Sequence, residues 1–155
     1  MKQEAKAVIF DWGRTLFDSE AKSEFPEAKE VLEHCAGKGY KMAVVSLVTQ
    51  HANSTLKERK RQIAESPLKK FFEIALVTDT DKDALFEQVV KELGLPREEI
   101  MIVDDRTVRG IRYGTRRGHP TVWLQKGKFS GELPDAETGR PDYVISELKE
   151  LLGIL

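Results

Sequence analysis

The sequence has little cysteine, no long apolar segment and almost no net charge. Its single cysteine, Cys35, has no partner within the chain, which excludes an internal disulfide and favours a reducing, cytoplasmic location. We expect neither a signal peptide nor a membrane-spanning helix, because no run of about 18 apolar residues is present. A formal net charge of -1 gives no general attraction to nucleic acid or acidic membranes, so neither is an expected partner.

The composition is that of a globular protein. Of the 155 residues, 40% are hydrophobic and 33% are charged, and neither repeats nor linkers interrupt them. This length suits one hydrophobic core. We therefore expect a single domain over residues 1–155.

Short apolar runs alternate with segments of helical spacing along the chain. Strands are predicted at residues 7–10, 41–45, 73–77, 100–103 and 121–124, with a short edge strand at 143–145. Helices are predicted at residues 27–37, 53–65, 84–93, 108–117 and 147–152, with Asn53 or Ser54 as the cap of the second. Because the strand runs are apolar without alternation, helices should cover both faces of the sheet. The pattern predicts an α/β fold with a three-layer, doubly wound, Rossmann-like parallel sheet.

Polar residues stand at the ends of these predicted strands. Asp11 follows the first, Ser46 the second, and Asp104 and Asp105 the fourth, while Lys82 precedes the helix after the third. Parallel sheets bind ligands at the carboxyl ends of their strands. Neighbouring carboxylates repel one another unless a cation lies between them, and oxygen ligands favour Mg²⁺. The hydroxyl and the ammonium group suit a phosphate.

These residues also carry a family resemblance. Residues 8–18 (VIFDWGRTLFD) resemble the first signature of haloacid dehalogenase (HAD)-like hydrolases, a strand followed by D-x-D-x-T-L. Residues 44–46 (VVS) resemble the second signature, Lys82 the third, and residues 102–105 (IVDD) the fourth. The four are in the family's order over most of the chain, and only the part after about Lys126 is loosely specified. The resemblance implies a HAD-like core.

The resemblance also implies a nucleophile and a metal site. Asp11 would attack phosphorus and form an aspartyl-phosphate. Mg²⁺ would be held by Asp11, by the backbone carbonyl of Gly13, and by Asp105 with help from Asp104.

A phosphate site is implied beside the metal. Ser46 and Lys82 would hold the phosphoryl oxygens, Trp12 and Gly13 would contribute to phosphate binding, and Thr15 would support the loop after the first strand. The Trp12 ring could stack on a substrate or cover the sheet end. The sequence leaves open whether Lys69 or Lys70 replaces Lys82.

The chain departs from the family pattern at two acids. Gly13 stands where the family has its general acid, whose loss typically costs ~10²–10⁴-fold in rate. Arg109 and Gly110 stand where another acid is common. Asp18 or His51 would have to reach the leaving group to compensate.

The spacing leaves no room for a cap domain. Only one helix fits between Asp11 and Ser46, and only a helix and a strand fit between Ser46 and Lys82. A capless site is open and suits a bulky or macromolecular phosphorylated substrate. It also leaves room for a homo-oligomer in which another subunit supplies the cap.

The sequence contains two basic runs. Residues 57–61 are expected to be a solvated run. Arg106, Arg109, Arg112, Arg116 and Arg117 form either a solvated face or a patch that steers an anionic substrate.

Three functions compete. The first is a magnesium-dependent phosphatase; the second is a catalytically impaired, HAD-like protein that binds phosphate or magnesium in a regulatory role. The third is a response-regulator receiver domain, whose phosphorylated aspartate would be Asp79 or Asp81. A receiver carries its acid pair after the first strand, whereas this pair follows the fourth, and the order argues against it.

Overall fold

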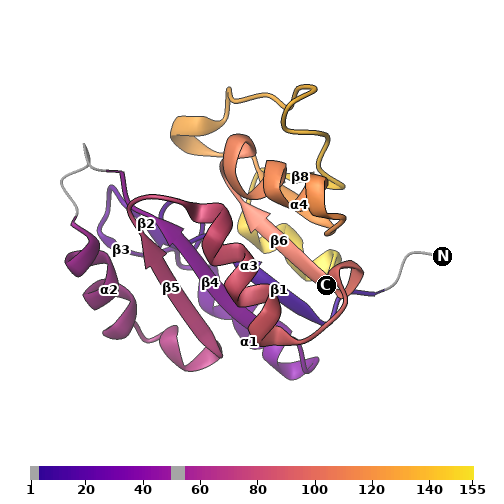
Figure 1. The fold of residues 1–155 in the computed structure, drawn as a ribbon. Coiled ribbons are helices and arrows are strands. Elements are labelled where there is room, and N and C mark those ends of the chain that lie inside the picture. Colours follow the sequence, from indigo (N-terminus) through magenta and orange to yellow (C-terminus); the bar gives the residue numbers. More distant parts are fainter. Residues whose placement is uncertain (1–3, 50–54) are drawn as a thin grey trace.

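A computed structural model describes residues 4–49 and 55–155, and its centre is one parallel sheet of six strands (Figure 1). The strands lie in the order β5-β4-β1-β6-β7-β8. Their bounds are Ala7–Phe10 (β1), Lys41–Leu47 (β4), Ile74–Thr78 (β5), Ile100–Asp104 (β6), Thr121–Leu124 (β7) and Tyr143–Ile145 (β8). Counted along the chain this is the order 3-2-1-4-5-6 of a Rossmann-like sheet, whereas a receiver domain has the order 2-1-3-4-5. The predicted fold class is confirmed, and the receiver interpretation is wrong.

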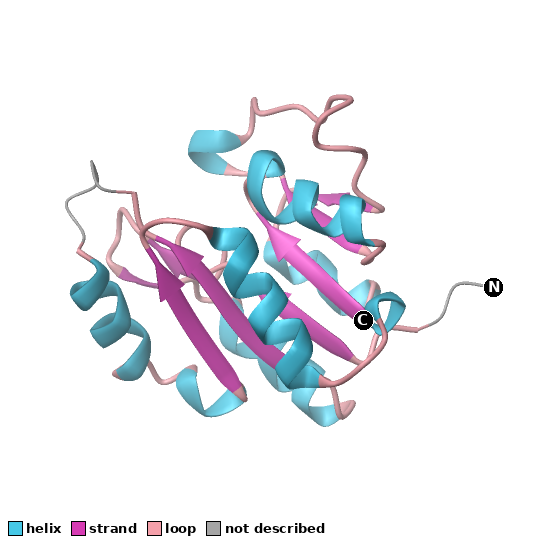
Figure 2. Ribbon diagram, in the orientation of Figure 1, coloured by secondary structure: helices cyan, strands magenta, loops and turns pink. Residues whose placement is uncertain are grey.

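Helices cover both faces of this sheet, which gives three layers (Figure 2). On one face lie α1 (Ala28–Gly37), α2 (Leu56–Ala64) and a C-terminal 3₁₀ helix (Leu148–Gly153). On the other lie α3 (Lys82–Leu93) and α4 (Arg112–Arg117). No cap domain interrupts the core in the described ranges: between β1 and α1 there is only a small hairpin, β2 (Phe17–Asp18) and β3 (Ser23–Glu24).

Strand β1 shows why the apolar runs do not alternate with polar residues. Val8 and Phe10 pack in the layer that contains α1, while Ala7 and Ile9 pack in the layer that contains α3 and α4. All four side chains are fully buried. A strand with helices on both sides needs an apolar side chain at every position.

Two predicted helices differ in type from the expectation. The helix predicted at 108–117 begins as a π-helix, Thr107–Ile111, and becomes α-helical only at Arg112. The helix predicted at 147–152 is a 3₁₀ helix in which Leu148 and Leu151, three residues apart, are both buried. That spacing places both leucines on one side of a helix with three residues per turn.

Helix α2 begins with a capping box. The Thr55 side chain accepts a hydrogen bond from the N–H of Glu58, and the Glu58 carboxylate accepts one from the N–H of Thr55. The predicted caps, Asn53 and Ser54, lie outside the described residues. No helix in the described ranges is both long and apolar enough to cross a membrane.

Candidate active site

Three carboxylates meet where the strand order of the sheet reverses. Strands β1 and β6 are parallel neighbours; Asp11 directly follows β1, and Asp104 and Asp105 lie at the end of β6. The N–H of Asp11 donates to the carbonyl of Val103 at 3.0 Å, which fixes the two strand ends together. One carboxylate oxygen from each aspartate lies within 4.8 Å of the other two. The sequence prediction of a carboxylate cluster therefore agrees with this geometry.

Lys82, the first residue of α3, joins two of these carboxylates. Its Nζ lies 3.0 Å from Oδ1 of Asp11 and 2.9 Å from Oδ2 of Asp104. Burial opposes the charge of the ammonium group, but the two carboxylates prevail and raise the pKa of Lys82. Lys69 and Lys70 are exposed in a 3₁₀ turn before β5. Of the three candidate lysines, the structure brings only Lys82 to Asp11.

Asp104 is buried and its carboxylate is already well supplied with donors. Besides Lys82, Oδ2 accepts the N–H of Gly110 at 2.9 Å, and Oδ1 accepts the N–H of Arg106 at 3.1 Å. Burial nevertheless raises the pKa of Asp104, against the effect of Lys82. These hydrogen bonds fix the position of the Asp104 carboxylate, which in turn holds the Lys82 ammonium group in place.

Asp11 and Asp105 are perturbed in opposite directions. Burial alone would raise the pKa of Asp11, but Lys82, a hydrogen bond from Asp105 and the charge of Arg59 lower it. Burial, followed by the charges of Asp11 and Asp104, raises the pKa of Asp105 to about 10. Lys82 alone therefore does not allow all three carboxyl groups to ionise, whereas a further cation would.

A hard divalent cation fits this arrangement. Oδ2 of Asp105 is buried and has no hydrogen-bond partner among the described residues. In the same part of the chain, no N–H donates to the carbonyl of Gly13. An unpaired buried carboxylate oxygen, a free carbonyl and the Asp11 carboxylate are ligands of the kind Mg²⁺ takes.

Ser46 has a partner that the sequence did not suggest. Its hydroxyl is buried near the end of β4 and accepts a hydrogen bond from Nη1 of Arg59 at 2.6 Å. Arg59 lies on α2, in the basic run at 57–61 that was expected to be solvated, and that expectation is wrong for this residue. The sequence signal for this position of Arg59 was Gly13, because a residue without a side chain leaves space for another group.

The Trp12 side chain does not face the site. It is fully buried, stacks on Phe17 at a centroid distance of 5.6 Å, and donates its indole N–H to Oε1 of Gln62 at 2.8 Å. Stacking of this ring on a substrate is therefore wrong; the ring covers the sheet end. The backbone N–H groups of Trp12 and Gly13 have no acceptor among the described residues, so they are free to meet a phosphate. Thr15 lies below them, with its hydroxyl 3.4 Å from Oδ2 of Asp11.

Of the two residues considered as a replacement acid, the structure describes Asp18, which does not lie at the site. The Asp18 carboxylate accepts the N–H groups of Glu20 and Ala21 in the hairpin turn and does not line the cleft around Asp11. His51 lies outside the described residues.

A small cleft of about 160 Å³ opens above Asp11 and Asp105, and its walls are cationic. The basic side chains that line it are Arg14, Arg59, Arg106, Arg109 and Lys128. Arg106 pairs with Glu132 at 3.0 Å and lies over the Phe129 ring at 3.8 Å. By contrast, Arg116 and Arg117 form exposed ion pairs with Glu137 and Glu87, away from the cleft. Within the arginine run, Arg106 and Arg109 therefore line the cleft, whereas Arg116 and Arg117 are exposed to solvent.

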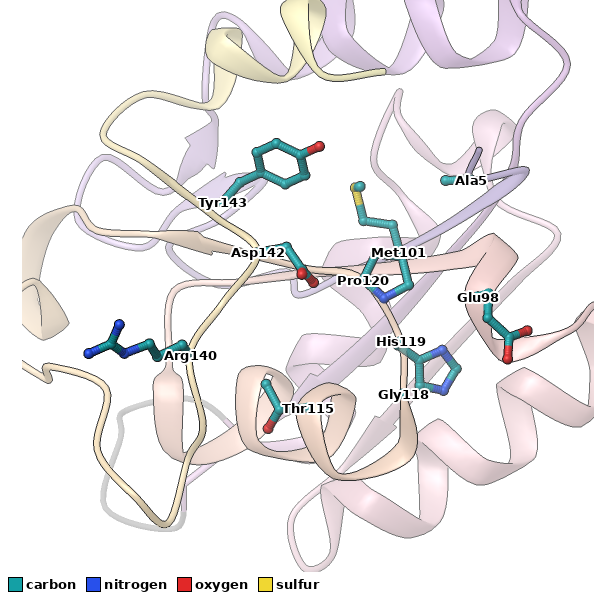
Figure 3. A pocket seen from close by; sticks show the side chains of 10 residues that line it. All are labelled: Ala5, Glu98, Met101, Thr115, Gly118, His119, Pro120, Arg140, Asp142 and Tyr143. Carbon is teal, nitrogen blue, oxygen red and sulfur yellow. The ribbon is translucent and has the colours of Figure 1, made fainter. Parts of the chain in front are cut away.

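A larger cavity, of about 500 Å³, lies elsewhere. Figure 3 shows its lining, which includes His119, Pro120 and Tyr143 from the segments that enter β7 and β8. It is at the amino-terminal edge of the sheet, opposite the aspartates, and contains none of the predicted site residues.

Sequence comparison gives one family and one curated relative. A family model described as haloacid dehalogenase-like hydrolase matches residues 1–124. The glyceraldehyde 3-phosphate phosphatase of Methanopyrus kandleri (strain AV19) is 32% identical over 71 residues. The match covers 46% of this chain and spans only 30% of that phosphatase.

Solved structures show the same fold at low identity. The L-2-haloacid dehalogenase from Xanthobacter autotrophicus has a TM-score of 0.77 at 13% identity, covering 97% of this chain and 98% of the dehalogenase. A HAD-hydrolase from Bacillus subtilis, solved bound to magnesium, has a TM-score of 0.77 at 14% identity, covering 99% of each chain.

Proposed function

Because this chain belongs to the haloacid dehalogenase-like hydrolase family, we propose that it is a magnesium-dependent phosphatase that acts through an aspartyl-phosphate on Asp11. The observation that carries the proposal is the position of Lys82, which is buried between Asp11 and Asp104. It keeps the Asp11 carboxylate ionised, as a nucleophile requires, and brings a positive charge to the place where phosphoryl oxygens would lie.

The first step is attack by a carboxylate oxygen of Asp11 on phosphorus. A new bond forms between that oxygen and phosphorus, and the bond from phosphorus to the leaving-group oxygen breaks, with its electron pair going to the leaving group. The backbone N–H groups of Trp12 and Gly13, together with Lys82 and the Ser46 hydroxyl, would hold the phosphoryl oxygens. Asp104 positions Lys82 through their 2.9 Å contact.

The second step is hydrolysis of the aspartyl-phosphate. A water molecule adds to phosphorus, the Asp11 carboxylate is released, and the proton of the water passes to the phosphate or to solvent. Mg²⁺, held by Asp11, Asp105 and the Gly13 carbonyl, would offset the charge of the phosphoryl oxygens in both steps.

The substrate is a phosphorylated compound. The curated relative is named for a phosphorylated aldehyde, and the cationic walls of the cleft suit an anion. Because the described residues contain no cap domain over the cleft, a bulky phosphorylated substrate could also enter.

The proposal is tested with an aryl phosphate, whose leaving group needs no protonation, assayed with and without Mg²⁺ beside Asp11→Asn. Magnesium-dependent turnover that disappears in Asp11→Asn is the expected result. If the protein and the variant do not differ, while Mg²⁺ still raises the melting temperature, the chain binds magnesium without catalysis, which is the regulatory alternative.

A further inference from the structure

Arg59 occupies the place beside Asp11 that a side chain at position 13 would take. A Cβ added to Gly13 would lie 3.3 Å from Nη1 and 3.4 Å from Nη2 of Arg59. The same guanidinium group donates to Ser46 and lines the cleft with Asp11 and Asp105. The glycine and the arginine are therefore complementary, since one leaves the space that the other fills.

Helix α2 holds Arg59 in this place. Gln62, three residues further along, accepts the indole N–H of Trp12, and Ile63, four residues further along, is buried. Residues three and four apart share one face of a helix. The inner face of α2 is thus fastened to the loop after β1, with Arg59 at its end nearest Gly13.

Arg59 makes no direct ion pair with a carboxylate of the described residues, although its charge acts on Asp11. Neither Arg59 nor Arg109, which lines the same cleft, forms an ion pair within the described part of the chain, and residues 1–3 and 50–54 contain no acidic residue. The Nε of Arg59 is also buried without a hydrogen-bond partner among the described residues. A half-buried, unpaired guanidinium group beside a nucleophile is suited to bind an anion.

We propose that Arg59 takes the place of the missing general acid and restricts the enzyme to phosphoryl donors whose leaving group departs as a stable anion, above all acyl phosphates and phosphoanhydrides, with activated aryl phosphates as artificial examples. The inference rests on the phosphatase function proposed above. Arginine stabilises negative charge but does not give up a proton at neutral pH. An alkoxide leaving group needs that proton, whereas a carboxylate or a phosphate does not.

The phosphoryl transfer needs no general acid with these donors. As the Asp11 oxygen bonds to phosphorus, the donor's bridging P–O bond breaks, and the carboxylate or phosphate leaves with the electron pair. Its new negative charge lies against Arg59, in the cleft that Arg109 also lines. The aspartyl-phosphate formed on Asp11 is itself an acyl phosphate, so its hydrolysis also expels a carboxylate that needs no proton.

The test measures kcat/KM with Mg²⁺ for acetyl phosphate, for aryl phosphates of graded leaving-group pKa, and for glycerol phosphate. We expect acetyl phosphate to be preferred over glycerol phosphate by ~10²-fold or more, the range that a general acid supplies. Arg59→Ala should lower kcat/KM for acetyl phosphate by ~10²-fold, as loss of one charge-stabilising donor does. Arg61→Ala, an exposed arginine on the same helix, is the matched control and should equal the wild type.

Two further variants separate a chemical role of Arg59 from a structural one. Gly13→Asp should not improve glycerol phosphate hydrolysis, because Arg59 would pair with the new carboxylate and keep it ionised. Gly13→Asp combined with Arg59→Ala frees that carboxylate to act as an acid, so kcat/KM should depend less steeply on leaving-group pKa than in Arg59→Ala.

Three results would overturn the inference: equal use of glycerol phosphate and acetyl phosphate by the wild type, Arg59→Ala activity equal to that of Arg61→Ala, or no change in leaving-group dependence in the double variant. The phosphatase proposal itself fails only if Asp11→Asn matches the wild type on every substrate, and then both fall.

Discussion

Gly110 approaches Asp104 so closely that a Cβ at position 110 would lie 2.7 Å from the Cβ of Asp104. Its N–H donates to the same Asp104 oxygen that contacts Lys82. No side chain fits in this gap, and the Gly110 backbone makes its hydrogen bond to Asp104 directly. Gly110 lies in the π-helix at Thr107–Ile111, whose backbone places the Gly110 N–H against the Asp104 carboxylate.

Gly110→Ala should therefore destabilise the protein. The added methyl group overlaps the Asp104 side chain, and such overpacking costs about 1–3 kcal/mol of unfolding free energy. Urea unfolding measures the loss. Gly37→Ala is the control: Gly37 ends α1, nothing lies within 4 Å of its added Cβ, and alanine there should be neutral or stabilising. Equal stability of the two variants would refute the close approach.

Lys82→Met should be more damaging, because it leaves Asp11 and Asp104 as buried carboxylates without their counter-ion. Removing one partner of a buried ion pair costs about 3–5 kcal/mol. Asp104→Asn added to Lys82→Met should recover part of the loss, which thermal unfolding of the single and double variants can measure. Lys91→Met, on the exposed side of the same helix, serves as control. A double variant no more stable than Lys82→Met would show that the pair is not coupled.

Mg²⁺ should raise the melting temperature, and Asp105→Asn should abolish that rise. A cation that binds only the folded state stabilises it by mass action, and Asp105 supplies the carboxylate oxygen without a partner in the described residues. In EDTA the variant should be at least as stable as the wild type, because asparagine avoids the cost of burying the Asp105 carboxyl beside Asp11 and Asp104, which raises its pKa. A magnesium-induced shift of the same size in Asp105→Asn would place the ion elsewhere.

His119 should make the protein less stable in mild acid. Its Nδ1–H points to the carbonyls of Ile100 and Arg97 at 3.0 and 3.1 Å, and burial outweighs these bonds and lowers the pKa of His119 below 6.5. Below pH 6.5 the unfolded chain therefore takes up a proton that the folded chain does not. The unfolding free energy then decreases as the pH is lowered, by up to about 1.4 kcal/mol per pH unit. His119→Gln should remove this part of the slope between about pH 7 and 5 in urea titrations. A slope identical to that of the wild type would contradict the assignment.

The strands were the part of the fold best specified by the sequence. Residues 7–10, 121–124 and 143–145 were predicted with the bounds that the structure shows, because short apolar runs buried on both faces leave a local signal. The strand ends then placed Asp11, Asp104 and Asp105 at one edge, since neighbouring parallel strands end together.

The features that the sequence missed depend on contacts between distant segments. The buried position of Trp12 depends on Gln62, fifty residues away. The role of Arg59 depends on Gly13 and Ser46, whereas its own neighbours, Glu58 and Lys60, are exposed charged residues typical of a solvated helix. The π-helix after β6 goes with the contact of Gly110 with Asp104, and apolar periodicity does not report such a contact.

The most direct test of the account is to trap the covalent step. The protein would be mixed with Mg²⁺ and acetyl phosphate, quenched in acid, digested and examined by mass spectrometry, beside Asp11→Asn. The account predicts one added phosphoryl group on the peptide that contains Asp11 and none in the variant. Phosphate release that depends on Asp11 while no phosphoryl group is trapped, or a phosphoryl group on another residue, would contradict it.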